Sequence, residues 1–179
     1  MSILHGIRRL AQFQADGFLS FKATPQALLS SLAPLVAFPL VGGLGELAQG
    51  NVATALSDLL ATAVALLTPL VVSEFLATRW GSGRMWLRYA VASNWCQWVL
   101  PLGAMVLVLA FWVLAQMGMP LGSGMVGAAI IGLICYGVGL HWFMARRGLG
   151  LSRGRATLMV IAADLTTGCL VMLPRVLAV

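Results

Sequence analysis

Five long apolar segments constrain the fold of this chain more than any other feature of its sequence. They cover approximately residues 24–47, 52–78, 85–117, 125–145 and 155–177. About 20 apolar residues of helix cross the hydrocarbon core of a bilayer, so each segment is long enough to span a membrane. Of the residues, 60% are apolar and only 9% charged, against about 25% charged in soluble domains. We therefore predict an all-α, polytopic transmembrane helical bundle with five spans.

Residues 1–23 contain no span and form an arm ahead of the five-span domain, which covers residues 24–179. Within the arm, residues 2–12 have one apolar and one basic helical face, formed by Ile3, Leu4, Ile7 and Leu10 on one side and by Arg8 and Arg9 on the other. A short basic amphipathic helix lying on the inner leaflet explains this pattern. The alternative is a frayed tail.

The third segment is too long for one straight crossing. A helix over residues 85–117 would reach roughly 50 Å at 1.5 Å per residue, whereas the hydrocarbon core is about 30 Å thick. Pro101 is the one strong helix breaker in it. We therefore expect a bend at Pro101, with residues 86–98 interfacial or strongly tilted and residues 99–116 forming the crossing.

The basic residues predict the orientation of the spans. Every basic residue except Arg175 lies in the arm, between spans two and three, or between spans four and five, namely Arg8, Arg9, Lys22, Arg79, Arg84, Arg88, Arg146, Arg147, Arg153 and Arg155. The alternate connections contain no basic residue. Positively charged connections stay on the cytoplasmic side. We expect a cytoplasmic N-terminus, a C-terminus outside, and no nucleic-acid partner for the net charge of +6.

Several polar residues fall within the predicted spans and form a candidate intramembrane polar network: Asp164, Asp58, Glu74, Asn94, Gln97 and Thr167. Ionisable groups are costly in a bilayer, so they face protein or water and find partners. For Glu74, near the cytoplasmic interface, we expect contact with water or with an arginine such as Arg79 or Arg155. Asp58 is equally shallow at the outer end of span two.

Asp164 is the deepest of these acids. It lies nine residues past Arg155, about 13.5 Å along a helix axis. We expect its side chain to be buried and bonded to a polar group from span two, or to Asn94 or Gln97. One hypothesis makes it a hydrogen-bonding lock between helices, and the other makes it a carrier of protons or ions.

Span four has a strip of small residues along one face, at Gly124, Ala128, Gly132, Cys135 and Gly139. Small residues let helix backbones approach closely in lipid. The strip predicts helix association, either with another span, which we favour, or with a second copy of the chain or another membrane protein.

The connection after span four carries candidate contacts for anionic lipid headgroups, Arg146, Arg147, Arg153 and Arg155. Arginines beside the inner leaflet attract such headgroups. Topology alone would also place these residues there.

Motifs of enzymes are missing from the sequence. It contains no HExxH, no GxSxG and no Walker loop. His141 is the only histidine in a span, so one chain cannot hold a haem between two intramembrane histidines. The three cysteines form no CxxC pair. We predict a protein that is not an enzyme and that has no catalytic, metal or cofactor site.

The basic arm and the five spans, together with "RYAVASNWCQW" at 88–98 and "YGVGLHWFMARRGLGLSRGRA" at 136–156, resemble the small bacterial membrane proteins of the Yip family. The resemblance extends over most of the chain and implies a membrane organising or interaction protein, in the inner membrane of a bacterium. It assigns no functional residues. The arm is shorter than that of the eukaryotic members, whose longer cytosolic arms bind small GTPases, so that partner class is not carried over.

Two function hypotheses follow from the sequence. The first is a membrane organising or protein-interaction component without catalytic activity. The second is a small proton- or ion-coupled carrier or channel that uses Asp164. Both have the lipid bilayer as their first partner.

The predicted orientation has a direct test. In a variant whose native cysteines are replaced, a cysteine at position 123 should react with a membrane-impermeant thiol reagent added outside the cell. A cysteine at position 152 should react only after the membrane is opened, because the basic connection is cytoplasmic. The reverse labelling pattern would contradict the orientation.

Overall fold

The computed structural model describes residues 2–119 and 122–177, and this part of the chain is helical without any strand. Its elements are α1 (Ile3–Ala11), η1 (Ala15–Ser20), α2 (Pro25–Ala48), α3 (Val52–Arg79), α4 (Gly83–Cys96), α5 (Val99–Gln116), α6 (Ser123–Gly148) and α7 (Arg153–Leu177). Five stretches are long and apolar enough to cross a membrane, with α4 and α5 together forming the third. The all-α fold class with five candidate spans is confirmed, and the chain is a multi-pass membrane protein.

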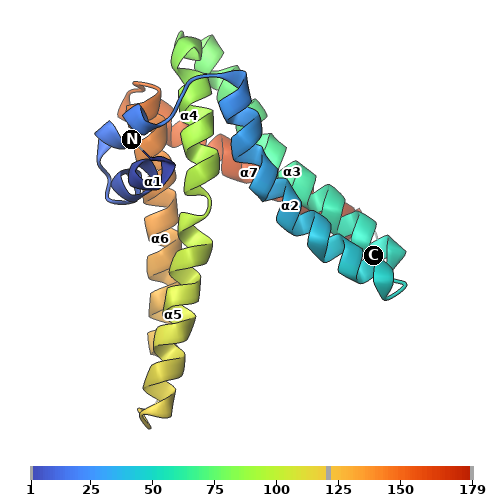
Figure 1. Ribbon diagram of the computed structural model, residues 1–179. Helices are drawn as coiled ribbons and strands as arrows, with labels where there is room; N and C mark the ends of the chain where they lie inside the picture. Colours follow the sequence, from blue (N-terminus) through green and yellow to red (C-terminus); the bar gives the residue numbers. More distant parts are fainter. Residues whose placement is uncertain (1, 120–121, 178–179) are drawn as a thin grey trace.

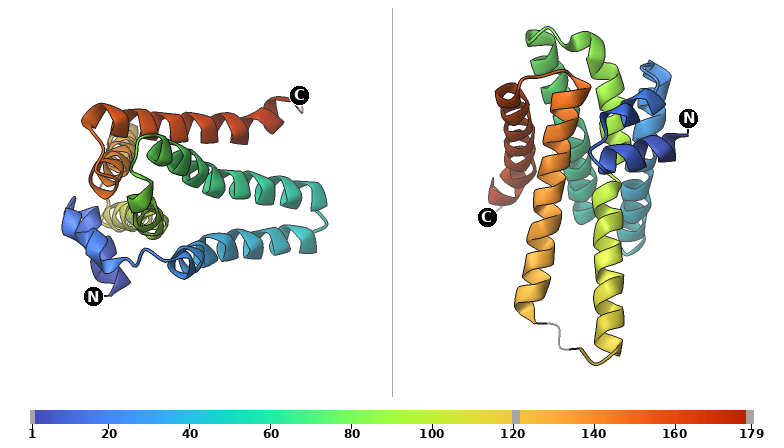
Figure 2. Two further views of the ribbon diagram at one scale, coloured as in Figure 1. Left: turned by 90° about the horizontal axis from the view of Figure 1, so that it is seen from above. Right: turned by 90° about the vertical axis from the view of Figure 1, so that its left-hand side faces the viewer.

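The helices form two arms that diverge from a common end, which we call the vertex (Figure 1). One arm is the hairpin of α5 and α6, and the other contains α2, α3 and α7 (Figures 1 and 2). In the second arm α3 packs against both α2 and α7. At the vertex lie α1, η1 and α4, with the C-terminal end of α6 and the N-terminal end of α7.

Helix α4 is the centre of the vertex. Its buried residues are Tyr89, Ala90, Val91, Ala92, Asn94 and Cys96, and α1, α2, α3 and α6 all pack against it. Residues 86–98, which we expected to be interfacial or strongly tilted, are thus packed on several sides by other helices. Small side chains such as Ala90 and Ala92, which are both fully buried, let these helices approach α4 closely.

The expected break in the third span is confirmed. The helix is interrupted at Gln97 and Trp98, between α4 and α5. Pro101 is the third residue of α5, where its missing N–H costs nothing. In a continuous helix its ring would collide with the carbonyl of Gln97, four residues earlier. The interruption therefore falls just before the proline.

The N-terminal arm is docked on the vertex. The predicted helix is present as α1, and Ser2 caps it by accepting a hydrogen bond from the backbone N–H of His5 at 3.3 Å. Its apolar face meets protein more than lipid, because Leu10 is fully buried whereas Leu4 is 77% exposed. The hydroxyl of Tyr136 donates to the carbonyl of Ala11 at 2.7 Å and so joins α6 to the end of α1. The frayed-tail alternative is excluded.

Phe13 closes α1 in an unusual backbone conformation, with φ of +59°. A bulky side chain rarely adopts this left-handed region. Its ring makes edge-on contacts with Tyr136 and Phe143, at centroid distances of 5.6 and 5.4 Å. These aromatic contacts each contribute about 0.5–1.5 kcal/mol and offset the backbone cost. The arm is thus held to α6 as well as to α4.

The basic segments gather at the vertex. The α3–α4 and α6–α7 connections lie there beside α1, whereas the α2–α3 turn lies at the tip of one arm (Figure 1). Gly50 forms that turn with φ of +84°, and no basic residue is near it in the sequence. The fold therefore keeps the charge asymmetry of the sequence.

One buried hydrogen bond ties the second arm to α4. The side-chain amide of Asn94, fully buried, donates to the hydroxyl of Ser31 in α2 at 3.0 Å. Ser31 in turn donates to the carbonyl of Leu28 at 2.7 Å. The amide oxygen of Asn94 has no partner among the described residues. Ser31 is therefore the one described side chain that satisfies Asn94.

Replacing Ser31 with alanine should destabilise the protein by about 1–2 kcal/mol, because it leaves the buried Asn94 amide without a partner. Ser30→Ala is the matched control. Ser30 is exposed, and its hydroxyl bonds only to the carbonyl of Gln26 in its own helix, so we expect a change within about 0.5 kcal/mol. The measurement is the free energy of unfolding in detergent. Equal values for the two variants would contradict the assigned role of the bond.

Candidate functional site, a polar cavity between the arms

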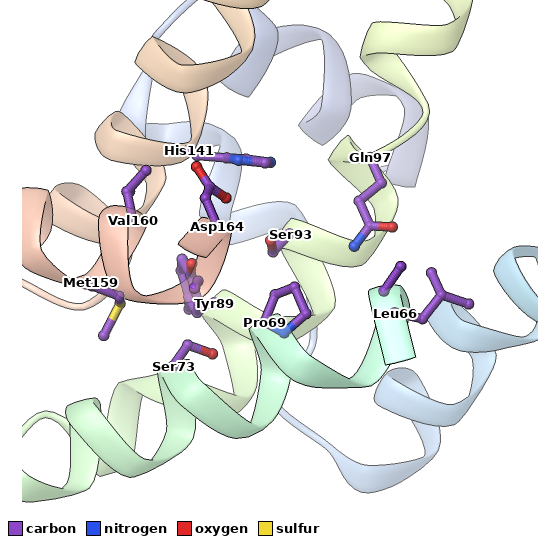
Figure 3. A pocket seen from close by; sticks show the side chains of 12 residues that line it. Leu66, Pro69, Ser73, Tyr89, Ser93, Gln97, His141, Met159, Val160 and Asp164 are labelled. Carbon is purple, nitrogen blue, oxygen red and sulfur yellow. The ribbon is translucent and has the colours of Figure 1, made fainter. Parts of the chain in front are cut away.

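A cavity of about 250 Å³ lies where the two arms diverge. Helices α3, α4, α6 and α7 all line it (Figure 3), with side chains of Ala65, Leu66, Pro69, Ser73, Tyr89, Ser93, Gln97, His141, Met159, Val160, Ala163 and Asp164. Half of these residues are apolar and half are polar. The cavity therefore brings polar groups from four helices together beside apolar wall residues, as ligand sites in proteins do.

Helix α4 and the residue that follows it supply half of the polar lining residues. Tyr89 and Ser93 of α4 and Gln97, directly after its end, follow each other at intervals of four residues and so point to the same side. The opposite wall comes from α7, where Val160 and Asp164 have the same spacing. The cavity is open because α6 and α7 leave the vertex in different directions (Figure 2).

Asp164 projects into this cavity, close to His141 (Figure 3). The carboxylate is near enough to interact electrostatically with His141 and with Tyr89. It is nevertheless exposed, and no hydrogen bond or ion pair joins it to another residue in 2–119 or 122–177. Asp164 thus lines the cavity, and the expectation of a buried, hydrogen-bonded carboxylate is wrong.

The divergence of the helices explains this error. Distance along the axis of α7 measures burial only in a bundle of parallel helices, whose neighbours cover every face. Here α7 stays beside α3 but moves away from α6 as it leaves the vertex (Figure 2). A residue far from Arg153 in sequence can therefore face an open cavity.

Only Gln97 among the other predicted network members lines the same cavity. Asn94 belongs to the α2–α4 contact through Ser31. Thr167 donates its hydroxyl to the carbonyl of Ala163 in its own helix, at 2.7 Å. The network predicted from the sequence is thus divided into separate local interactions.

The remaining two acids, Asp58 and Glu74, are both exposed on α3 and lie outside the cavity. Within the described part of the chain, Glu74 forms no ion pair with Arg79 or Arg155, and its exposed side chain agrees with the alternative that it reaches water. The one ion pair within the described part of the chain joins Arg9 to Asp16. The Nε of Arg9 also donates a hydrogen bond of 2.9 Å to the Asp16 carboxylate.

Sequence reasoning missed four polar residues of the cavity, namely His141, Tyr89, Ser93 and Ser73. His141 is five residues before Arg146 in the sequence, and its half-buried side chain lines the cavity. The spacing of Tyr89, Ser93 and Gln97 was readable as a polar face of α4. Nothing in the sequence indicated that Asp164 and His141 would meet this face.

Two of the predicted lipid-contacting arginines are stacked on aromatic rings. The guanidinium carbon of Arg146 lies 5.3 Å from the ring centre of Trp142, and that of Arg155 lies 5.8 Å from the ring centre of Trp80. Such cation–π contacts hold cations over aromatic faces. Arg153 is exposed, and Arg147 lines a separate cavity.

The strip of small residues on α6 does not pack against another span of this chain. Gly124, Ala128, Gly132 and Cys135 are exposed, and a Cβ atom added at Gly124 or Gly132 would meet no atom within 4 Å. Only Gly139 is approached, by the ring of Phe13 at 3.9 Å. The favoured prediction of intramolecular packing through the strip is therefore wrong.

A different glycine mediates the contact of α6 with α5. A Cβ atom at Gly137 would lie 2.8 Å from a methyl group of Leu100. A larger residue there would require the Leu100 side chain to move, because Cβ contacts below 3.0 Å essentially do not occur in proteins. Gly137 lies outside the predicted strip.

The chemistry available in the cavity is that of a carboxylate, an imidazole, a phenol and a hydroxyl within one apolar enclosure. These groups bind protons and small cations and donate hydrogen bonds. Within residues 2–119 and 122–177, no group of three metal-ligating side chains gathers in one place. Comparison with protein-family models, with curated proteins and with solved structures finds no match to this chain.

Proposed function

We propose that this protein is a membrane-embedded interaction component, which associates with a second copy of itself through α6. The observation that carries the proposal is the exposed strip of small residues at Gly124, Ala128, Gly132 and Cys135. Lipid chains pack well against large apolar side chains. A continuous strip of small ones is typical of a helix–helix contact in a bilayer.

The surroundings of the strip fit a second helix. Gly132 also lines an apolar groove of about 540 Å³ between α5 and α6, with Gly103 and Ala129 in its wall. No residue of α5 is buried, so the arm of α5 and α6 has ample free surface. Large side chains of an opposing α6 would fit into this groove, in the manner of ridges packing into grooves.

The cellular setting is the second part of the proposal. The basic segments gathered at the vertex favour a cytoplasmic vertex, with the N-terminus inside and the C-terminus outside. The resemblance to Yip-family proteins supports a bacterial inner membrane and a role in membrane organisation. The protein acts in this proposal without catalysis.

Cross-linking through native cysteines tests the association. Cys135 and Cys169 are exposed, whereas Cys96 is buried. Under mild oxidation in native membranes we expect a disulfide-linked dimer through Cys135, because a symmetric contact brings the same residue of both copies together. The dimer should be lost in Cys135→Ser and retained in Cys169→Ser. Its yield is measured by non-reducing gel electrophoresis.

A pair of glycine variants separates this contact from chance collisions. Gly132→Ile adds bulk to the strip, and Gly168→Ile adds the same bulk in α7, where it also meets no atom within 4 Å. We expect Gly132→Ile alone to lower the yield of the dimer. Equal yields in both variants, or a dimer that depends on Cys169, would refute association through α6.

A second candidate function is a small proton-coupled carrier. One specific observation favours it, namely that Asp164 and His141 lie in the same cavity and interact electrostatically. Intramembrane carboxylates and histidines form proton relays in pumps and transporters. In this candidate, Asp164 is the group that takes up and releases the proton.

For a carrier, Asp164→Asn should abolish proton movement in proteoliposomes, because an amide keeps the shape but cannot titrate. Asp58→Asn, at the exposed carboxylate outside the cavity, is the control and should leave it unchanged. A water-filled cavity also predicts that Ser93→Cys reacts with a hydrophilic thiol reagent while Cys96, nearby in α4 but only 2% exposed, does not. Absence of proton movement in the parent protein would eliminate this candidate and leave the first untouched.

A further inference from the structure

A second charged cavity, of about 310 Å³, lies at the vertex. It is enclosed by η1, the first turns of α4 and the last turn of α6, and its lining residues are Ala15, Phe18, Ala23, Arg84, Met85, Arg88, Arg147 and Gly148. We call it the arginine cavity. It is separate from the polar cavity, with which it shares no lining residue.

The charge of the arginine cavity is uncompensated. Arg84, Arg88 and Arg147 all line it, and no acidic residue does. Within the described residues none of the three has an ion pair or a hydrogen-bonded side-chain partner. Asp16 is the one acidic residue in the three elements that enclose the cavity, and it is already paired with Arg9. Three cations that share one cavity repel one another, and an anion between them would relieve this repulsion.

The helix geometry places the two exposed arginines of α4 side by side. Arg84 and Arg88 are four residues apart and so lie on the same face of the helix. The first turn of α4 has no acidic residue, and Ser82 makes no side-chain cap, so the positive end of the helix dipole adds to the field of the arginines. Arg147 approaches from the last turn of α6.

Part of the cavity wall is apolar. Phe18 and Met85 line it. A Cβ atom at Gly148 would lie 2.7 Å from the ring of Phe18, so the glycine lets η1 approach α6 closely. A ligand with a phosphate group and an adjoining apolar part matches this combination of walls and charges.

We propose that the arginine cavity binds the phosphate group of an anionic ligand, which in the membrane is the headgroup of an anionic phospholipid. Guanidinium groups donate forked hydrogen bonds that match phosphate oxygens. The predicted lipid contacts Arg146 and Arg155 are not part of this site, because they lie over Trp142 and Trp80. The proposal does not depend on association through α6.

The test uses the full-length protein in detergent micelles and measures its thermal unfolding midpoint. Phosphatidylglycerol, phosphatidylcholine and inorganic phosphate are titrated separately. A ligand that binds only the folded protein raises the midpoint in a saturable way. We expect saturation with phosphatidylglycerol and none with phosphatidylcholine. A full shift with inorganic phosphate at similar concentrations would identify a soluble phosphate ligand as the source and still support the site.

Arginine variants locate the site. Arg88→Gln and Arg147→Gln should each weaken the apparent affinity for phosphatidylglycerol by about tenfold, the effect of losing one charge-assisted contact. Arg153→Gln is the control, because it removes one positive charge from the neighbouring connection, outside the cavity. The affinity for phosphatidylglycerol should stay within about twofold of the parent value, since only the net charge changes. Arg88→Lys keeps the positive charge but loses the forked hydrogen-bond donors, so it should bind phosphatidylglycerol more weakly than the parent protein does. This variant keeps the test decisive if a glutamine variant fails to fold.

Three results would overturn the proposal. These are equal shifts with phosphatidylglycerol and phosphatidylcholine, no saturable shift with either phosphatidylglycerol or phosphate, and an Arg153→Gln variant that loses as much affinity as Arg88→Gln and Arg147→Gln. The last result would mean that the vertex attracts anions only through its net charge.

Discussion

Close packing around α4 is the constraint on which the rest of the structure depends. Five elements, α1, η1, α2, α3 and α6, contact this one helix, and only small side chains such as Ala90 and Ala92 leave room for all of them. Once α4 occupies the vertex, the interruption at Gln97 and Trp98 lets the chain continue as α5 in the hairpin arm. Divergence of the two arms follows, because α2 and α3 leave from other sides of the same helix and α7 packs beside α3.

This arrangement separates the buried core from the apolar surface. The core side chains gather at the vertex, where Leu10, Met144, Leu149 and Met159 are almost completely buried. The arms expose their apolar side chains, as Leu60 in α3 and Val108 in α5 do. Exposure on this scale is stable only in a bilayer. Protein packing therefore defines the vertex, and lipid completes the environment of the arms.

The polar groups divide in the same way. Asn94 lies where helices are in contact, so it is fully buried and uses Ser31 as its partner. Asp164 lies where they diverge, so it faces a cavity together with His141. Asn94 and Asp164 are similar in size but thus have different roles. Asn94 holds helices together, and Asp164 is exposed to any ligand that enters the cavity. Arg146 and Arg147 are adjacent in sequence but have different surroundings. The guanidinium of Arg146 lies over the ring of Trp142, whereas Arg147 lines the arginine cavity.

Local features of the sequence determined the helices of this protein. The apolar segments defined five spans, Thr24 capped α2 through the N–H of Ala27, and Pro101 placed the break between α4 and α5, because these effects act within one or two helical turns. Tertiary structure alone decided what each helix face meets. The strip at Gly124 and Gly132 was left open while Gly137 received Leu100, and His141 came to lie beside Asp164. Such pairings depend on the angles at which helices cross, and those angles arise from the packing of residues far apart in the chain.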